Sequence, residues 1–119
     1  MLPQNTMMRI LCLLSILLLS LGCSGSVGPN GDVVGGPCTA TSGCAGGSRC
    51  LVEGDFPGGS CTIDCDGPSM CPSGSACVEE NEGTCLDLCS SDGDCRAGYR
   101  CVSKRNLGAE GESRVCMGG

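Results

Sequence analysis

Residues 89–101 read CSSDGDCRAGYRC, and five residues separate each cysteine from the next. The same C-x5-C-x5-C spacing occurs at residues 38–50 and 65–77. A fourth cysteine follows each group, and three residues then separate it from the next group. Spacing that recurs in this way indicates internal repeats. The sequence therefore predicts three tandem four-cysteine repeats, which we call repeats one, two and three, at residues 38–61, 65–85 and 89–116.

Glycines recur at one position of these repeats. Gly47, Gly74 and Gly98 each lie three residues after the second cysteine of their repeat. Glycine adopts positive φ at little cost, unlike residues with a side chain. We therefore expect a turn with positive φ at all three positions.

The chain beyond its first 22 residues has too few large apolar side chains for an ordinary core. Leu, Ile, Val and Phe account for 13 of the 97 residues from 23 to 119, below the ~20% that marks chains without a packed core. Disulfides take over this role in small exported domains. We predict a small disulfide-rich fold with little regular secondary structure, and two disulfides in each repeat among Cys38, Cys44, Cys50, Cys61, Cys65, Cys71, Cys77, Cys85, Cys89, Cys95, Cys101 and Cys116.

The spacing leaves the pairing of these cysteines open, because four cysteines permit several pairings within a repeat. Bridges across the three-residue spacers, which would tie neighbouring repeats together, are a further alternative. We favour first-to-third and second-to-fourth bonds, since crossed links constrain a small loop most. Short strands are expected at 49–53, 76–79, 99–103 and 113–117, forming small β-hairpins across the loop between the third and fourth cysteines. With little apolar surface between them, the repeats are expected to stack as an extended rod.

The first 22 residues have the pattern of a signal peptide. Arg9 precedes an apolar run from Ile10 to Leu21, and a helix of this length is too short to cross a hydrocarbon layer of ~30 Å. The chain is therefore expected to be exported.

The end of this leader resembles a bacterial lipobox. Gly22 and Cys23 match the small residue and the acylated cysteine, whereas Ser20 occupies a position that is usually Leu, Val or Ile. An ordinary secretory signal cleaved nearby is the alternative. Lipidation of Cys23 leaves an even number of cysteines in the rest of the exported chain, and an odd one needs an explanation. We therefore expect a lipid anchor in the bacterial envelope, at the outer membrane, and otherwise a secreted protein.

Residues 23–37 are predicted to be the lipidated cysteine and a flexible tether. Five Gly, two Ser and two Pro occur in residues 24–37, which disfavours regular structure. A flexible chain of this length would hold repeat one about 20 Å from the lipid.

Repeat three resembles a known module. The run from Cys89 to Cys101 is similar to the opening of the Dickkopf N-terminal cysteine-rich domain and to tandem repeats of bacterial cysteine-rich lipoproteins. Repeats one and two keep the spacing but lack the Ser-Asp-x-Asp run. The resemblance implies a secreted, receptor-binding module, and a Dickkopf-like ligand is one alternative function. Because a lipobox does not fit an animal ligand, we carry over the module type and not its pathway.

Catalytic and metal chemistry find little support in this sequence. The chain has no His and no C-x2-C pair, so the usual Cys–His, Ser–His and dithiol systems are absent. The C-x3-C pairs at 61–65 and 85–89 have zinc-like spacing but straddle repeat boundaries. The run Asp92-Gly93-Asp94 echoes a calcium loop yet lacks the distal Glu, which favours an exposed turn. We expect no enzyme activity, no cofactor and no metal site.

The expected function is a surface or envelope interaction module that binds a protein or glycan. The loops between the third and fourth cysteines contain 10, 7 and 14 residues, and variable loops on a fixed frame usually carry specificity. Residues 23–119 hold 6 basic and 13 acidic side chains, which disfavours nucleic acid. The alternative functions are metal binding or thiol redox chemistry by free cysteines. The candidate partner contacts are Phe56, Tyr99, Arg100, Lys104, Arg105 and Arg114, although the two aromatic side chains could instead shield disulfides while the basic ones offset local acid.

Overall fold

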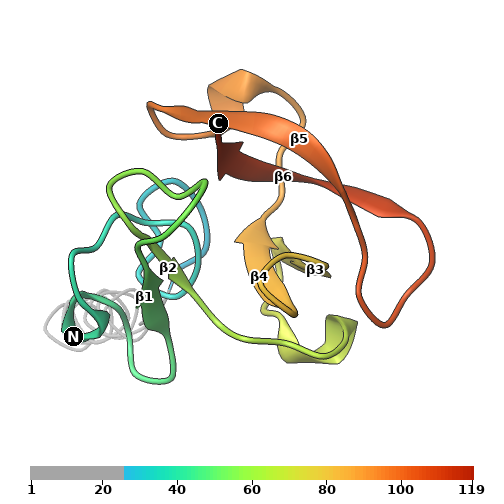
Figure 1. Ribbon diagram of the computed structural model, residues 1–119, viewed down its shortest axis with the longest axis horizontal. Helices are drawn as coiled ribbons and strands as arrows, with labels where there is room; N and C mark the ends of the chain where they lie inside the picture. Colours follow the sequence, from blue (N-terminus) through green and yellow to red (C-terminus); the bar gives the residue numbers. More distant parts are fainter. Residues whose placement is uncertain (1–25) are drawn as a thin grey trace, which may run out of the picture.

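The computed structural model describes residues 26–119, and each cysteine repeat forms one antiparallel β-hairpin (Figure 1). Strands β1 (Arg49–Leu51) and β2 (Ser60–Thr62) belong to repeat one, and β3 (Ser75–Val78) and β4 (Thr84–Asp87) belong to repeat two. Repeat three contributes the longest pair, β5 (Tyr99–Arg105) and β6 (Glu112–Gly118). The predicted hairpins across the third-to-fourth cysteine loops are confirmed. The second strands of repeats one and two were not among the segments that the sequence singled out.

A one-turn 3-10 helix precedes each hairpin at the same place in the repeat. These turns are η1 (Thr41–Gly43), η2 (Pro68–Met70) and η3 (Asp92–Asp94), and each begins three residues after the first cysteine. The recurring glycines then turn the chain into the first strand, with φ of 88° at Gly47, 89° at Gly74 and 85° at Gly98. The predicted positive φ is therefore confirmed.

Six disulfides join the first cysteine to the third and the second to the fourth within every repeat. The bonds are Cys38–Cys50, Cys44–Cys61, Cys65–Cys77, Cys71–Cys85, Cys89–Cys101 and Cys95–Cys116. The hairpin register accounts for this crossed pattern, because the third cysteine lies directly opposite the fourth in each strand pair. Opposite residues of an antiparallel pair project to the same face. The sulfur atoms of the third and fourth cysteines therefore both lie next to the turn that carries the first two cysteines.

The segment before each repeat pairs locally with the second strand of that repeat, through backbone hydrogen bonds or an isolated bridge. The Gly35 amide donates to the Cys61 carbonyl at 2.8 Å, and the Cys61 amide donates to the Gly36 carbonyl at 2.9 Å. The chain before repeat two pairs in the same manner, since Asp64 bridges to Thr84. The chain before repeat three does likewise through Leu88 and Val115, again in an antiparallel bridge.

The expectation of a flexible tether over residues 23–37 does not hold for residues 26–37, and residues 23–25 lie outside the described part. The described part, residues 26–37, is a compact loop in which Val27 and Val34 form a bridge and Val34 is fully buried. Its glycines were interpreted as a sign of flexibility, but they are needed for close packing. A Cβ at Gly36 would lie 2.5 Å from the Gly31 carbonyl oxygen.

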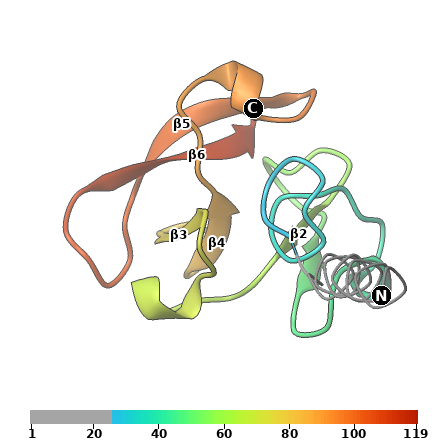
Figure 2. The ribbon, with the colours of Figure 1, turned by 180° about the vertical axis from the view of Figure 1, so that it is seen from behind.

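The expectation of an extended rod is wrong. All three repeats surround one buried cluster, and the β5–β6 hairpin lies across the β3–β4 hairpin (Figures 1 and 2). Few apolar residues are needed to build this cluster, because nearly all of those that face the interior of the protein contribute to it. The cluster contains Leu51, Phe56, Val78, Leu86, Tyr99, Val115, Cys116 and Met117.

The end of the chain closes the three repeats into a ring. The Gly118 amide in β6 donates to the Asp55 carbonyl of repeat one at 2.7 Å. A Cβ at Gly118 would lie 2.3 Å from Pro57, so only glycine allows the two backbones to approach this closely. Repeats one and three, which are distant in sequence, are therefore direct neighbours.

Candidate functional site

Two of the six predicted partner contacts lie in the interior. Phe56 is 1% exposed and Tyr99 is 6% exposed, and both belong to the shared cluster together with Cys116. A partner cannot reach them in this structure. The alternative interpretation, in which these aromatic side chains pack around the disulfides, describes them better.

Lys104 and Arg105 pair with acidic residues of repeat two. The Lys104 Nζ atom lies 3.1 Å from Glu80, and the Arg105 Nε atom lies 3.9 Å from Glu79. The Glu79 amide also donates to the Arg105 carbonyl at 2.8 Å. These contacts fasten β5 to the β3–β4 turn. The long loop of repeat three is thus a strap over repeat two and not a free loop.

The remaining two basic residues, Arg100 and Arg114, are exposed. The Arg114 Nη1 atom donates to the Ser90 carbonyl at 2.8 Å, which holds that side chain along the entry to repeat three. Arg105 also keeps most of its side chain exposed. Arg105 and Arg114 therefore share one face of the β5–β6 hairpin, whereas Arg100 projects from the other face.

The sequence did not single out Arg96, whose guanidinium group joins repeats one and three. Its Nη2 atom donates to the Gly59 carbonyl and, at 2.6 Å, to the Tyr99 hydroxyl. The guanidinium carbon lies 4.2 Å from the centre of the Tyr99 ring, within cation–π range. The Tyr99 hydroxyl in turn lies 3.1 Å from the Pro57 carbonyl. The only signal in the sequence is that a long basic residue follows the second cysteine in repeat three, where repeats one and two have Ala45 and Pro72.

Asp87 is a buried carboxylate next to this junction. It ends β4, and a Cβ built at Gly35 would lie 2.9 Å from its carboxyl group. Burial raises the pKa of Asp87 above its usual value, and a hydrogen bond from its own backbone amide and the nearby positive charge of Arg96 offset this only in part. Burial likewise raises the pKa of the Tyr99 hydroxyl, against the opposing effect of Arg96.

The raised pKa of Asp87 gives a stability prediction with a definite sign. Asp87 ionises first in the unfolded chain, as pH rises past about 3.8. The free energy of unfolding therefore decreases from there up to the higher folded-state pKa. Asp87→Asn is expected to match the wild type near pH 3 and to be the more stable of the two at pH 7, as measured by denaturant unfolding. Glu53→Gln, at an exposed position, is the control. A variant that is less stable at pH 7 would mean that attraction to Arg96 outweighs burial.

The Ser-Asp-x-Asp run of repeat three is a structural turn, as the sequence indicated. Asp94 accepts hydrogen bonds from the Ser90 and Ser91 amides at 2.8 and 3.1 Å, which lowers its pKa. Asp92 accepts from the Cys101 amide at 2.9 Å. Thr41 does the same for Cys50 in repeat one, at 3.4 Å. Because both carboxylates already serve backbone donors, they fix the hairpin to its turn.

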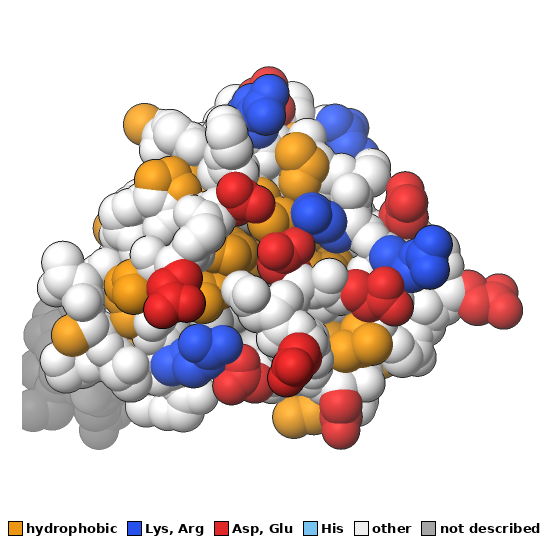
Figure 3. Space-filling view, in the orientation of Figure 1, with side chains coloured by type: hydrophobic (Ala, Val, Ile, Leu, Met, Phe, Trp, Pro, Cys, Tyr) orange, Lys and Arg blue, Asp and Glu red, His pale blue; other side chains and the backbone are white. Residues whose placement is uncertain are grey.

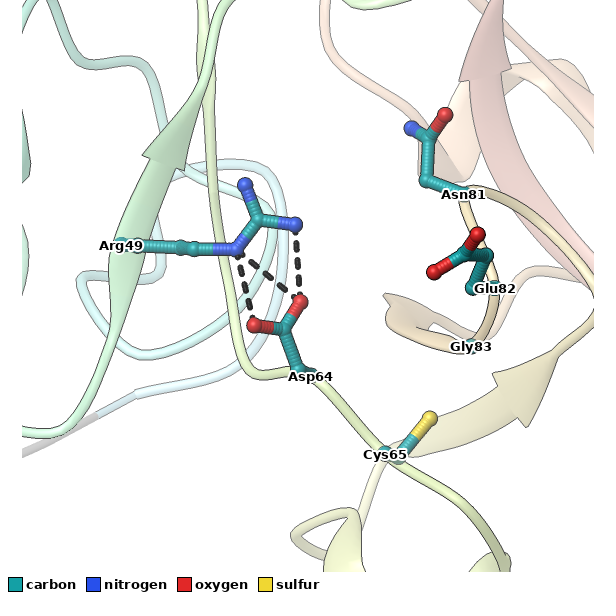
Figure 4. A pocket seen from close by; sticks show the side chains of 6 residues that line it. All are labelled: Arg49, Asp64, Cys65, Asn81, Glu82 and Gly83. Carbon is teal, nitrogen blue, oxygen red and sulfur yellow. Dashed lines mark hydrogen bonds and ion pairs between the residues drawn. The ribbon is translucent and has the colours of Figure 1, made fainter.

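A polar hollow of about 350 Å³ lies between repeats one and two (Figure 4). Arg49 and Asp64 form one wall, joined by a two-pronged ion pair in which Nη2 donates to Oδ1 at 2.7 Å and Nε donates to Oδ2 at 3.1 Å. Asn81 and Glu82 lie across from them on the β3–β4 turn. These two residues have φ of 48° and 67°, which is uncommon for residues other than glycine.

The lining of this hollow suits binding more than catalysis. Cys65 contributes to the wall but is bonded to Cys77, and none of the other lining residues is a nucleophile paired with a base. The charged groups are one guanidinium and two carboxylates. A ligand in this hollow would meet hydrogen-bonding groups and a slight net negative charge.

The sulfur atoms form three compact groups, one in each repeat. In each group the Sγ atoms of the first, second and fourth cysteines lie within 4.8 Å of one another. All of them are disulfide-bonded, whereas metal coordination uses the thiolate. The C-x3-C pairs that resembled zinc ligands are divided between neighbouring repeats.

The signal peptide and Cys23 lie outside the described residues. Within residues 26–119, the structure contains no helix with the length and hydropathy to span a bilayer.

Comparisons with family models, with curated proteins and with solved structures each returned no match. The similarity of repeat three to the Dickkopf module therefore rests on the residues quoted above alone.

Proposed function

We propose that this chain is a non-enzymatic, exported interaction module, anchored to the bacterial envelope by acyl chains on Cys23. The observation that carries the proposal is the consumption of all twelve repeat cysteines in six disulfides. Disulfides of this density persist in oxidising compartments. They also leave no thiol in residues 26–119 for metal binding or redox exchange, which disfavours the alternative functions.

The partner surface that we propose is the β5–β6 hairpin. Arg105 and Arg114 are exposed on one face of it and Arg100 on the other, in a chain that is otherwise acidic. Arg is enriched among the residues that dominate binding energy. An anionic partner, such as a surface glycan or an acidic protein, would complement this hairpin, and nucleic acid is disfavoured by the net charge.

Intact mass spectrometry of the envelope protein tests both the anchor and the cysteine chemistry. The protein is alkylated under denaturing, non-reducing conditions and compared with Cys23→Ser. We expect a mature chain that begins at Cys23, carries the mass of acyl chains and takes up no alkylating agent. Several alkylated cysteines would support the metal or redox alternative. A chain cleaved near Cys23 without acyl mass would make the protein secreted.

A further inference from the structure

The folded body begins directly after the proposed anchor. Ser26 is already part of it, because its amide donates to the Asp32 carboxylate at 2.8 Å and its carbonyl accepts from Val33 at 3.0 Å. Only Ser24 and Gly25 separate Ser26 from Cys23. At ~3.3–3.6 Å per residue, three steps of extended chain span about 10 Å. This is half the distance that a flexible tether up to Pro37 would allow.

The part of the body nearest this short connection is almost free of charge. Asp32 is the only charged residue from 26 to 47, and its carboxylate is occupied by the Ser26 amide. The Asp32 carbonyl accepts from the Ala45 amide at 2.8 Å, so the loop before repeat one and the turn within it lie together. We call residues 26–32 and 39–47 the neutral end.

The charged residues are distributed over the rest of the molecule. On the face in Figure 3, the left edge, where repeat one lies, is mostly uncharged, and acidic and basic side chains crowd the right-hand half. The tip of the β5–β6 hairpin lies at the opposite end from the loop of residues 26–37 in both ribbon views (Figures 1 and 2). On this face the charged side chains therefore lie away from the left edge.

This distribution of charge suits a position next to a negatively charged surface, because such a surface repels carboxylates. Anionic lipids give a bilayer a negative potential that decays over a Debye length of about 8 to 10 Å. That distance matches the reach of the two-residue connection. A net-acidic body held so close meets the least repulsion when its uncharged end faces the headgroups.

We infer that the neutral end rests directly on the lipid headgroups and that the tip of the β5–β6 hairpin points away from the membrane. This inference depends on the proposed acylation of Cys23. In this arrangement the folded body does not tumble freely on a tether. One of its sides always faces the membrane and the opposite side faces outward. Arg105, at the start of the tip, is then presented to the surroundings.

Paramagnetic relaxation in a bilayer tests this orientation. The acylated full-length mature protein is placed in nanodiscs of phosphatidylethanolamine and phosphatidylglycerol that contain a gadolinium-chelate lipid. Relaxation enhancement of the amides of Gly28, Gly31 and Gly43 is expected to exceed that of Gly108 and Gly111 several-fold. Equal enhancement at both ends, or a larger one at Gly108 and Gly111, would overturn the inference.

Two matched insertions separate the tether from the rest of the fold. A twenty-residue Gly-Ser segment between Gly25 and Ser26 is expected to abolish the difference between the two ends, because its r.m.s. length is about 25 Å. The same segment between Ala109 and Glu110, in the hairpin tip, is expected to leave the difference unchanged. A difference that survives the first insertion would show that the short connection does not set the orientation.

The mass of the mature N-terminus, measured on the same sample, distinguishes two kinds of failure. A chain without acyl groups would refute the proposed anchoring itself. An acylated chain with equal relaxation at both ends would retain the anchor and refute only the orientation.

Discussion

Full reduction of the six disulfides is expected to unfold all three repeats together. Each bond closes a segment whose ends are 12 to 21 residues apart, and a loop of about 15 residues is worth ~3 kcal/mol in the chain-entropy model. The shared apolar cluster is too small to replace these links. Treatment with dithiothreitol, followed by amide exchange monitored by NMR, is expected to leave no slowly exchanging amide in residues 26–119.

The oxidised protein, incubated without reductant, is the control, and alkylation followed by mass measurement confirms that reduction is complete. The hairpin β5–β6 gives the most demanding test, because it has the longest ladder of backbone hydrogen bonds. Protected amides that survive there after full reduction would show that the apolar cluster alone maintains the fold.

The spacing of the cysteines predicts the repeats and hairpins because it acts locally. Five residues between cysteines fit one 3-10 turn followed by a glycine turn, as between Cys89 and Cys101. The third and fourth cysteines then lie opposite each other, which favours the crossed bonds. Each of these features depends on residues that are close in sequence, and each recurs three times.

The contacts between repeats could not be predicted in this way. Arg96 and Gly59 are 37 residues apart, and their contact occurs once, so no periodicity reveals it. Burial of Asp87 depends on the same junction. Phe56 and Tyr99 were interpreted as surface anchors because they are the only aromatic residues. In a chain with so few large apolar side chains, the same scarcity makes them the first residues to be buried.

The packing of the loop before repeat one also has a signal in the sequence. Residues 35–37 precede its first cysteine as residues 62–64 and 86–88 precede the other two. Extending the comparison of the repeats by three residues places Gly35 and Gly36 in a structural position instead of a tether. Glycine content indicates flexibility only where no neighbouring strand needs a close backbone approach.

Replacement of Phe56 by Ala is expected to destabilise repeat three as well as repeat one. Phe56 lies in the loop of repeat one, is 1% exposed, and shares its cluster with Tyr99 and Met117 of repeat three. Truncation of a buried Phe to Ala typically costs about 3–5 kcal/mol. Denaturant unfolding is expected to show a loss of that size, and exchange is expected to accelerate at the Gly118 amide, which bonds to Asp55 next to the cavity.

Val52→Ala is the matched control for this truncation. Val52 lies in the same loop but is 59% exposed, so its truncation is expected to change stability by no more than about 0.5 kcal/mol. The decisive observation is where exchange accelerates in Phe56→Ala. Faster exchange confined to residues 38–61 would mean that the repeats are independent units. Faster exchange that extends to β6 would mean that one aromatic side chain joins the two ends of the chain, and that the three repeats fold as a single cooperative body.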